Sequence, residues 1–340
     1  MSKVTCNSRS TAIIGMDKNV GKTTVLNYII SKTEGNNVLG LTSIGRDGES
    51  VDRVTHTPKP RIYVSRGTIL ATAKQCMFQS DITKEILEST SIKTPLGNIV
   101  FIRSLSDGYI DLAGPSTTSQ MREIVSKLKK YKVDEIYVDG AISRMTQCSP
   151  SIVDSAVLCT GAVLGRSIEM VVNKTNHVVR MLLLQKHEMS DYLEKIEIPA
   201  EYRVVFVLID GSLKFLEAQT SMEVAEKIAD YLEYKISIIY IRGVLSEDIS
   251  KKILSNKPKK SRIDLVVEDG TKIFLSADIY AQMKRHLLNI YVLNPINLKE
   301  LYYNPTSPSG TKLDDIDFKL ALQESTGLKA INVLGRKNYE

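Results

Sequence analysis

A segment near the N-terminus, residues 11–24, combines glycine, lysine and hydroxyl side chains in an order that suits phosphate binding. It ends in Gly21, Lys22, Thr23 and Thr24. Glycine lets backbone N–H groups approach phosphate oxygens, and the start of a following helix adds a positive dipole end. In such a loop the lysine reaches the outer phosphates and the hydroxyl binds Mg²⁺. Lys22 and Thr23 are therefore candidate catalytic residues. The expected ligands are ATP and Mg²⁺.

The spacing of this segment differs from the usual phosphate-binding loop, G-x-x-x-x-G-K-S/T. Five residues separate Gly15 from Gly21, and Met16 stands where the first glycine is expected. A glycine-lysine-threonine sequence can also begin a helix by chance, so the flanking elements matter to the interpretation. The residues expected to surround the nucleotide are Gly15, Asp17, Lys18, Asn19, Val20, Gly21, Lys22, Thr23 and Thr24.

The elements needed to position this loop are predicted on both sides of it. The apolar run 12–14 is typical of a buried strand, and residues 23–32 carry apolar side chains at helical spacing. Residues 37–45 predict a second strand, which leads into a polar loop over 46–52. Ligand groups collect at the carboxyl ends of strands in open α/β sheets, so this second loop is expected to contribute to the same site.

Several carboxylates are candidate metal ligands, because Mg²⁺ takes one or two carboxylates alongside phosphate oxygens. Asp111 and Asp139 each follow an apolar, strand-like run. Asp139 is the preferred metal ligand of the two, and we also predict it to be a catalytic residue. Asp47 is the preferred candidate in the loop after the second strand, ahead of Glu49 and Asp52. Aspartate at such positions also caps turns, so each assignment has a structural alternative. The predicted metal ligands are Thr23, Asp47, Asp111 and Asp139.

Composition narrows the classes of protein and partner. The chain has 340 residues and a net charge of +6, which is too mild over this length to indicate nucleic-acid binding. Its four cysteines lack the spacing of a zinc site or of a disulfide framework, which favours a reducing compartment. We find no signal-peptide pattern and no apolar run of about 18 residues. A cytoplasmic protein without membrane contact is expected.

Alternating strand and helix signals run through the chain and predict an α/β fold. We expect a P-loop NTPase-type, mostly parallel sheet flanked by helices, followed by a second α/β domain without a phosphate loop. The polar region 185–201 is the expected boundary, giving a nucleotide-binding domain over 1–190 and a C-terminal domain over 200–340. Residues 68–79 are expected to be helical, and 302–310 to form a turn-rich connection.

The sequence from Gly15 to Thr23 resembles the lengthened loop of the dethiobiotin synthetase and cobyrinate amidase branch, G-T-D-x-x-V-G-K-T, with Met16 replacing threonine. A wider resemblance is to the small subunit of lysine 5,6-aminomutase reactivase. It extends over most of the chain and is carried by residues 15–24, 40–49, 110–116, 138–144 and 303–308.

The wider resemblance implies a role in bacterial lysine fermentation. The expected partners are a MutS-like reactivase subunit, itself an ATPase, and lysine 5,6-aminomutase, which uses adenosylcobalamin. ATP binding and hydrolysis would open the stalled mutase so that damaged cobalamin leaves. Two alternatives stay open: an ATP-dependent carboxylate ligase of dethiobiotin synthetase type, and a nucleotide-sensing subunit without turnover. A homo-oligomer is also compatible with the sequence.

Overall fold

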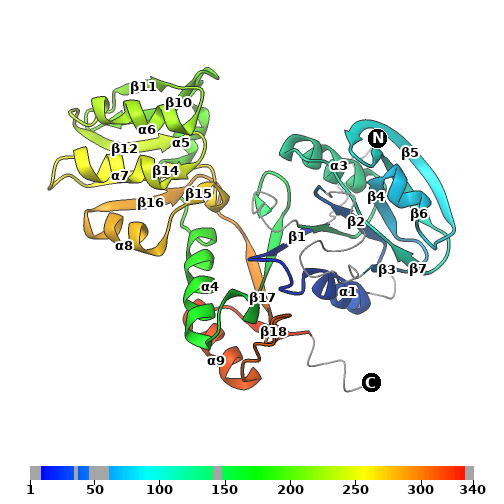
Figure 1. Ribbon diagram of the computed structural model, residues 1–340. Coiled ribbons are helices and arrows are strands. Elements are labelled where there is room, and N and C mark those ends of the chain that lie inside the picture. Colours follow the sequence, from blue (N-terminus) through cyan, green and yellow to red (C-terminus); the bar gives the residue numbers. More distant parts are fainter. Residues whose placement is uncertain (1–8, 34–36, 46–60, 141–147, 334–340) are drawn as a thin grey trace. The chain divides into compact units, whose positions relative to one another are not determined.

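The computed structural model describes residues 9–33, 37–45, 61–140 and 148–333 (Figure 1). The chain divides into two compact units, one made of residues 1–176 and 297–340 and the other of residues 177–296. The first unit is therefore built from two separate stretches of sequence. The sequence led us to expect two contiguous domains, 1–190 and 200–340. The observed division differs, because residues 297–340 return to the first unit.

In its described residues, the first unit contains a nine-stranded sheet with the order β18-β17-β9-β1-β8-β2-β4-β6-β5. Neighbouring strands from β18 to β4 are parallel, whereas β6 is antiparallel to both β4 and β5. All the parallel strands thus end at one edge of the sheet, where loops can form a common site. The strands are β1 Arg9–Gly15, β2 Leu39–Ser43, β4 Ile69–Ala73, β5 Lys84–Thr94, β6 Gly97–Ser104, β8 Glu135–Asp139, β9 Ser155–Gly161, β17 Leu298–Asn304 and β18 Ala330–Asn332.

Helices cover both faces of this sheet. Figure 1 shows α1 and α3 on opposite sides of the strands around β1 and β2. The apolar stripe of α1, at Val25, Leu26 and Ile30, is buried in one core cluster with Ile13 and Leu41. The other elements of the unit include a ribbon of β3 Ile62–Val64 and β7 Gly108–Ile110 and the helices α1 Lys22–Thr33, α2 Lys74–Phe78, α3 Thr118–Lys130 and α9 Asp315–Thr326. Helix α4 Ile168–Leu182 begins in this unit and ends in the second.

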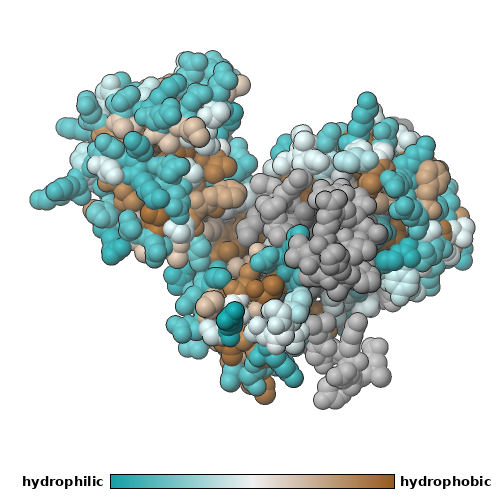
Figure 2. Space-filling model, in the orientation of Figure 1, coloured by the Kyte–Doolittle hydropathy of each residue, from teal (hydrophilic) through white to brown (hydrophobic). Residues whose placement is uncertain are grey.

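The second unit has its own sheet, with the order β11-β10-β12-β14-β16 in the described residues. Its helices α6, α7 and α8 bury apolar side chains against one face of this sheet, in a single core cluster. The visible surface over α6 and α7 is mostly hydrophilic, as expected for amphipathic helices (Figure 2). The elements are α5 Ser190–Lys195, β10 Tyr202–Leu208, β11 Leu213–Glu217, α6 Ser221–Lys227, β12 Ile236–Ile241, β13 Leu245–Ser246, α7 Glu247–Asn256, β14 Ile263–Val267, β15 Ile273–Phe274, α8 Ala277–Arg285 and β16 Leu288–Val292.

The structure confirms the mixed α/β class and corrects two local predictions. Residues 69–73 form the buried strand β4, so the helix expected over 68–79 is limited to α2. The error has a physical cause: a strand buried on both faces shows no alternation, and its periodicity cannot be told from that of a helix. Residues 298–304 form β17, which extends into the region expected to be a loop. Among the described residues, no helix is both long and apolar enough to cross a bilayer.

Candidate functional site

The predicted phosphate loop lies where a parallel strand passes into a helix. β1 ends at Gly15 and α1 begins at Lys22, with residues 16–21 between them. The carbonyl oxygen of Gly21 accepts the first helical hydrogen bond, from Val25 N–H at 2.9 Å. Gly21 has φ of +91°, a conformation that favours glycine. A glycine here also supplies no side-chain cap, and the first N–H groups of a helix have no partner within it.

Lys22 is folded back over the start of the loop. Its Nζ donates to the carbonyl oxygen of Asp17 at 3.1 Å. Its side chain occupies the space beside Gly15, where an added Cβ would lie 2.7 Å from the lysine Cδ. Glycine at this position is therefore what allows the lysine to lie across the loop. Burial lowers the pKa of Lys22, while the nearby carboxylates of Asp139 and Asp17 oppose that change.

Asp139 ends β8, the strand that lies between β1 and β2. Its backbone is held on both sides, because its carbonyl oxygen accepts from Ile44 N–H at 3.2 Å and the next N–H, of Gly140, donates to Ile13 O at 2.9 Å. The carboxylate oxygen Oδ1 is buried, and the side chain is close enough to Lys22 to favour the charged ammonium. The fold thus brings together Lys22 and Asp139, which are far apart in the sequence.

Asp111 lies farther along the same edge of the sheet. It follows β7, and its carbonyl oxygen accepts from the Thr72 hydroxyl at 3.3 Å near the end of β4. β4 is separated from β8 by β2, so Asp111 is more distant from the loop than Asp139. The chain that follows Asp111 passes very close to the end of β2, since a Cβ added to Gly114 would lie 1.5 Å from Ser43 O. The geometry favours Asp139 as the carboxylate nearest the loop.

The remaining predicted residues divide by their environment. Val20 is 1% exposed and belongs to the core under α1, so its role is packing. Lys18 and Asn19 are exposed, and the Lys18 N–H donates to Asp17 Oδ1 at 2.6 Å. Thr23 and Thr24 are half-buried in the first turn of α1. Asp47, Glu49 and Asp52 lie outside the described residues.

Cys159 forms part of the floor of the site and was not predicted from the sequence. It ends the segment of β9 that pairs with β1, opposite Gly15, and its carbonyl oxygen accepts from Met16 N–H at 3.0 Å. Burial raises the pKa of its thiol to about 12, so the sulfur is protonated at neutral pH and is no nucleophile. A cysteine within an apolar run carries no sequence signal for this placement, since only strand order brings it there.

The donor set near the loop suits Mg²⁺ better than a transition metal. Within the described residues, no three His, Cys, Asp or Glu side chains are grouped as a metal site. Mg²⁺ does not need such a group, because it keeps waters and takes phosphate oxygens with only one or two carboxylates. The Thr23 hydroxyl and the Asp139 carboxylate are oxygen donors of the required kind. The chemistry of these residues therefore fits a metal that arrives with phosphate.

Comparisons with known proteins add no relative. No family model, no curated protein and no solved structure matches the chain.

Proposed function

We propose that the first unit is a P-loop-type nucleotide-binding domain that binds ATP with Mg²⁺ at residues 15–24. The observation that carries the proposal is Lys22, which lies over Gly15 at the junction of a parallel strand and a helix, beside Asp139 from the adjacent strand. A cation, uncapped helical N–H groups and a neighbouring carboxylate are together the components of a site for a metal-bound polyphosphate.

Each residue has a defined part in this proposal. The loop N–H groups and Lys22 would hold the phosphate oxygens and stabilise the charge that develops on the leaving phosphates. Thr23 and Asp139 would hold Mg²⁺, which neutralises phosphate charge when it is bound. Asp17 positions the lysine through its backbone carbonyl. Hydrolysis by this set requires positioning and charge stabilisation, and no covalent step on the protein.

The cellular role that we propose is ATP binding and hydrolysis within a reactivase for adenosylcobalamin-dependent lysine 5,6-aminomutase. This part rests on the resemblance in the segments at 15–24, 40–49, 110–116, 138–144 and 303–308. The chain would act with a MutS-like subunit, and the energy of ATP would open the stalled mutase to release damaged cobalamin. Cobalamin itself need not contact this chain.

The test is ATP hydrolysis by the chain alone, with the MutS-like subunit, and with the subunit plus cobalamin-inactivated mutase. Lys22→Ala removes the loop cation and is expected to lower kcat/KM by at least about 100-fold. Lys93→Ala is the control, because it removes an exposed lysine on β5, outside residues 15–24. Stimulation by the inactivated mutase that Lys22→Ala abolishes is the expected result.

Other outcomes separate the alternatives. Nucleotide binding without turnover in any mixture would favour the sensing subunit. Turnover that requires an added carboxylate would favour the ligase. Activity unchanged in Lys22→Ala, with the variant folded, would overturn the assignment of residues 15–24 as the nucleotide site.

A further inference from the structure

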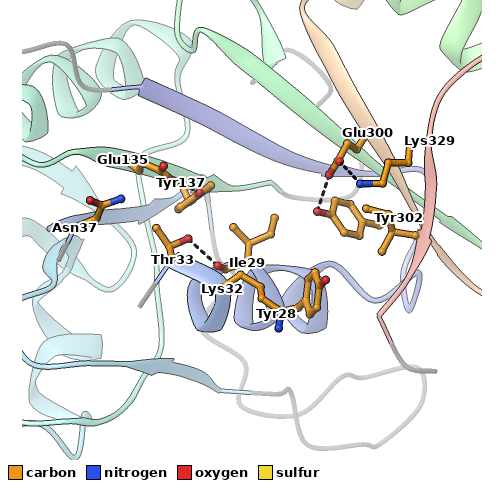
Figure 3. Close-up of a pocket in the computed structure, with 11 residues that line it drawn as sticks. Tyr28, Ile29, Lys32, Thr33, Asn37, Glu135, Tyr137, Glu300, Tyr302 and Lys329 are labelled. Atoms are coloured by element: carbon orange, nitrogen blue, oxygen red, sulfur yellow. Dashed lines mark hydrogen bonds and ion pairs between the residues drawn. The ribbon is translucent and has the colours of Figure 1, made fainter. Parts of the chain in front are cut away.

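A polar pocket of about 620 Å³ lies within the first unit, between α1 and one face of the large sheet (Figure 3). The C-terminal half of α1 supplies Tyr28, Lys32 and Thr33, whereas the phosphate loop joins the other end of this helix. Glu135 and Tyr137 come from β8, and Glu300 and Tyr302 from β17. A volume of this size accommodates a small metabolite.

The two carboxylates of the pocket have different partners. Glu300 accepts from the Tyr302 hydroxyl at 3.0 Å and pairs with Lys329 at 3.3 Å, so its charge is compensated. Glu135 accepts a hydrogen bond from the Tyr137 hydroxyl, and within the described part of the chain it forms no ion pair. A hydroxyl does not neutralise a carboxylate, so Glu135 presents a negative charge to the pocket.

Tyrosine rings line the pocket: the Tyr137 hydroxyl bonds Glu135, and the Tyr302 hydroxyl bonds Glu300. Tyr137 and Tyr302 are 8% and 5% exposed, and Tyr28 packs edge-on against Tyr302 with ring centroids 6.3 Å apart. Burial raises the pKa of both Tyr137 and Tyr302, so both rings are neutral in the physiological range. The Tyr137 ring is thus a neutral aromatic surface beside the Glu135 carboxylate, an arrangement that attracts organic cations, and an ammonium group gains most when it is partly desolvated.

Lys32 adds a positive charge at the rim. It is exposed on α1, its ammonium lies 5.9 Å from the Tyr28 ring centroid, and it forms no ion pair among the described residues. The pocket therefore has one uncompensated carboxylate on β8 and one uncompensated ammonium on α1. A ligand that carries an amine can use the first, and a ligand that also carries a carboxylate can use both.

We propose that this pocket binds a small primary amine whose ammonium group is held by Glu135 beside the Tyr137 ring. The site is separate from residues 15–24, so it does not depend on the nucleotide assignment. Diamines and amino acids share this ammonium group, and Lys32 is the residue that distinguishes them. An amino acid would place its carboxylate toward Lys32, whereas a diamine would gain nothing from that lysine.

The test is calorimetric titration of the full chain with 1,4-diaminobutane, L-ornithine and succinate. We expect one or both amines to bind and succinate not to bind. Glu135→Gln keeps an acceptor for the Tyr137 hydroxyl but removes the charge, and it should weaken amine binding by about 10- to 100-fold. Glu324→Gln, an exposed glutamate on α9, is the matched control and should leave binding unchanged.

Two further variants complete the test. Lys32→Gln should weaken ornithine and spare diaminobutane if the natural ligand is an amino acid, and spare both if it is a simple amine. Lys22→Ala should leave amine binding intact, which separates this proposal from the nucleotide site. Preferential binding of succinate, absence of binding by both amines, or equal amine affinity in folded Glu135→Gln and wild type would each overturn the proposal.

Discussion

The two units each contain a parallel strand that passes through a loop into a helix, yet the two helices begin with different residues. In the first unit β1 leads to α1, and in the second unit β12 leads to α7 by way of the short strand β13. Both helices begin beyond the carboxyl end of a parallel strand. Their topology is similar, so the difference between them must come from the residues at the helix start.

The start of α7 is satisfied by its own sequence. The Ser246 hydroxyl accepts from Ile249 N–H, and the first turn contains Glu247 and Asp248. These acids already interact favourably with the helix dipole and would repel a phosphate. By contrast, α1 follows Gly21, has no acid in its first turn and begins with Lys22. The start of α1 is therefore better suited to an anion than the start of α7.

The strongest test of this contrast in the first unit is Asp139→Asn. If Asp139 holds Mg²⁺ beside the loop, the variant should lose about 10- to 100-fold in apparent Mg²⁺ affinity during ATP binding. Asp111→Asn is the matched control, because Asp111 follows β7, lies near the end of β4 and should have a smaller effect. Titration of Mg²⁺ against a fluorescent ATP analogue measures both. Equal effects of the two substitutions would remove Asp139 from its special role.

A second test compares one glycine from each unit, each near the carboxyl end of a parallel strand. Gly114→Ala would place a Cβ 1.5 Å from Ser43 O, so the chain across β2 must shift, and we expect destabilisation of about 1–3 kcal/mol. Gly243→Ala, after β12, meets no atom within 4 Å and should be neutral or slightly stabilising. Urea unfolding of each variant gives the comparison. A harmless Gly114→Ala would contradict the close approach of these backbones.

A third test concerns the caps themselves. Ser246→Ala removes the cap of α7 and should lower stability by about 1 kcal/mol. Thr23→Ala at the start of α1 should change stability by less than about 0.5 kcal/mol while weakening Mg²⁺-dependent ATP binding. Thermal unfolding and nucleotide titration distinguish the two roles. The contrast between the helix starts fails if Thr23→Ala destabilises as much as Ser246→Ala.

The smallest effect is expected from acid titration of α7. Hydrogen bonds from Ser276, and then the interaction with Lys251, lower the pKa of Glu247 from 4.5 to about 2. A carboxyl group with a lowered folded-state pKa stabilises the fold above its unfolded pKa and loses that contribution as the pH falls. Between pH 4.5 and 2, wild type should therefore lose more stability than Glu247→Gln. Circular dichroism across this range would show parallel curves if the interaction contributes nothing.

Local sequence determined much of what forms the site. The apolar run of β1, the loop with Gly21 and Lys22, and the helical spacing of α1 all depend on neighbours in the chain, and all three elements lie close to their predicted positions. The strand ending in Asp139 was predicted for the same reason. These features are set by steric freedom of glycine and by side-chain periodicity, which act over only a few residues.

Tertiary structure decided which of these residues meet. Strand order places β8 beside β1, so that Asp139, rather than Asp111, lies near Lys22. It also brings Cys159 under the loop and returns the chain through β17 to complete the large sheet. This C-terminal stretch also supplies Glu300 and Tyr302 to the pocket that contains Glu135. Hydrogen bonding between strands and burial of their shared faces select these pairings among segments far apart in sequence, and neither leaves a local signature.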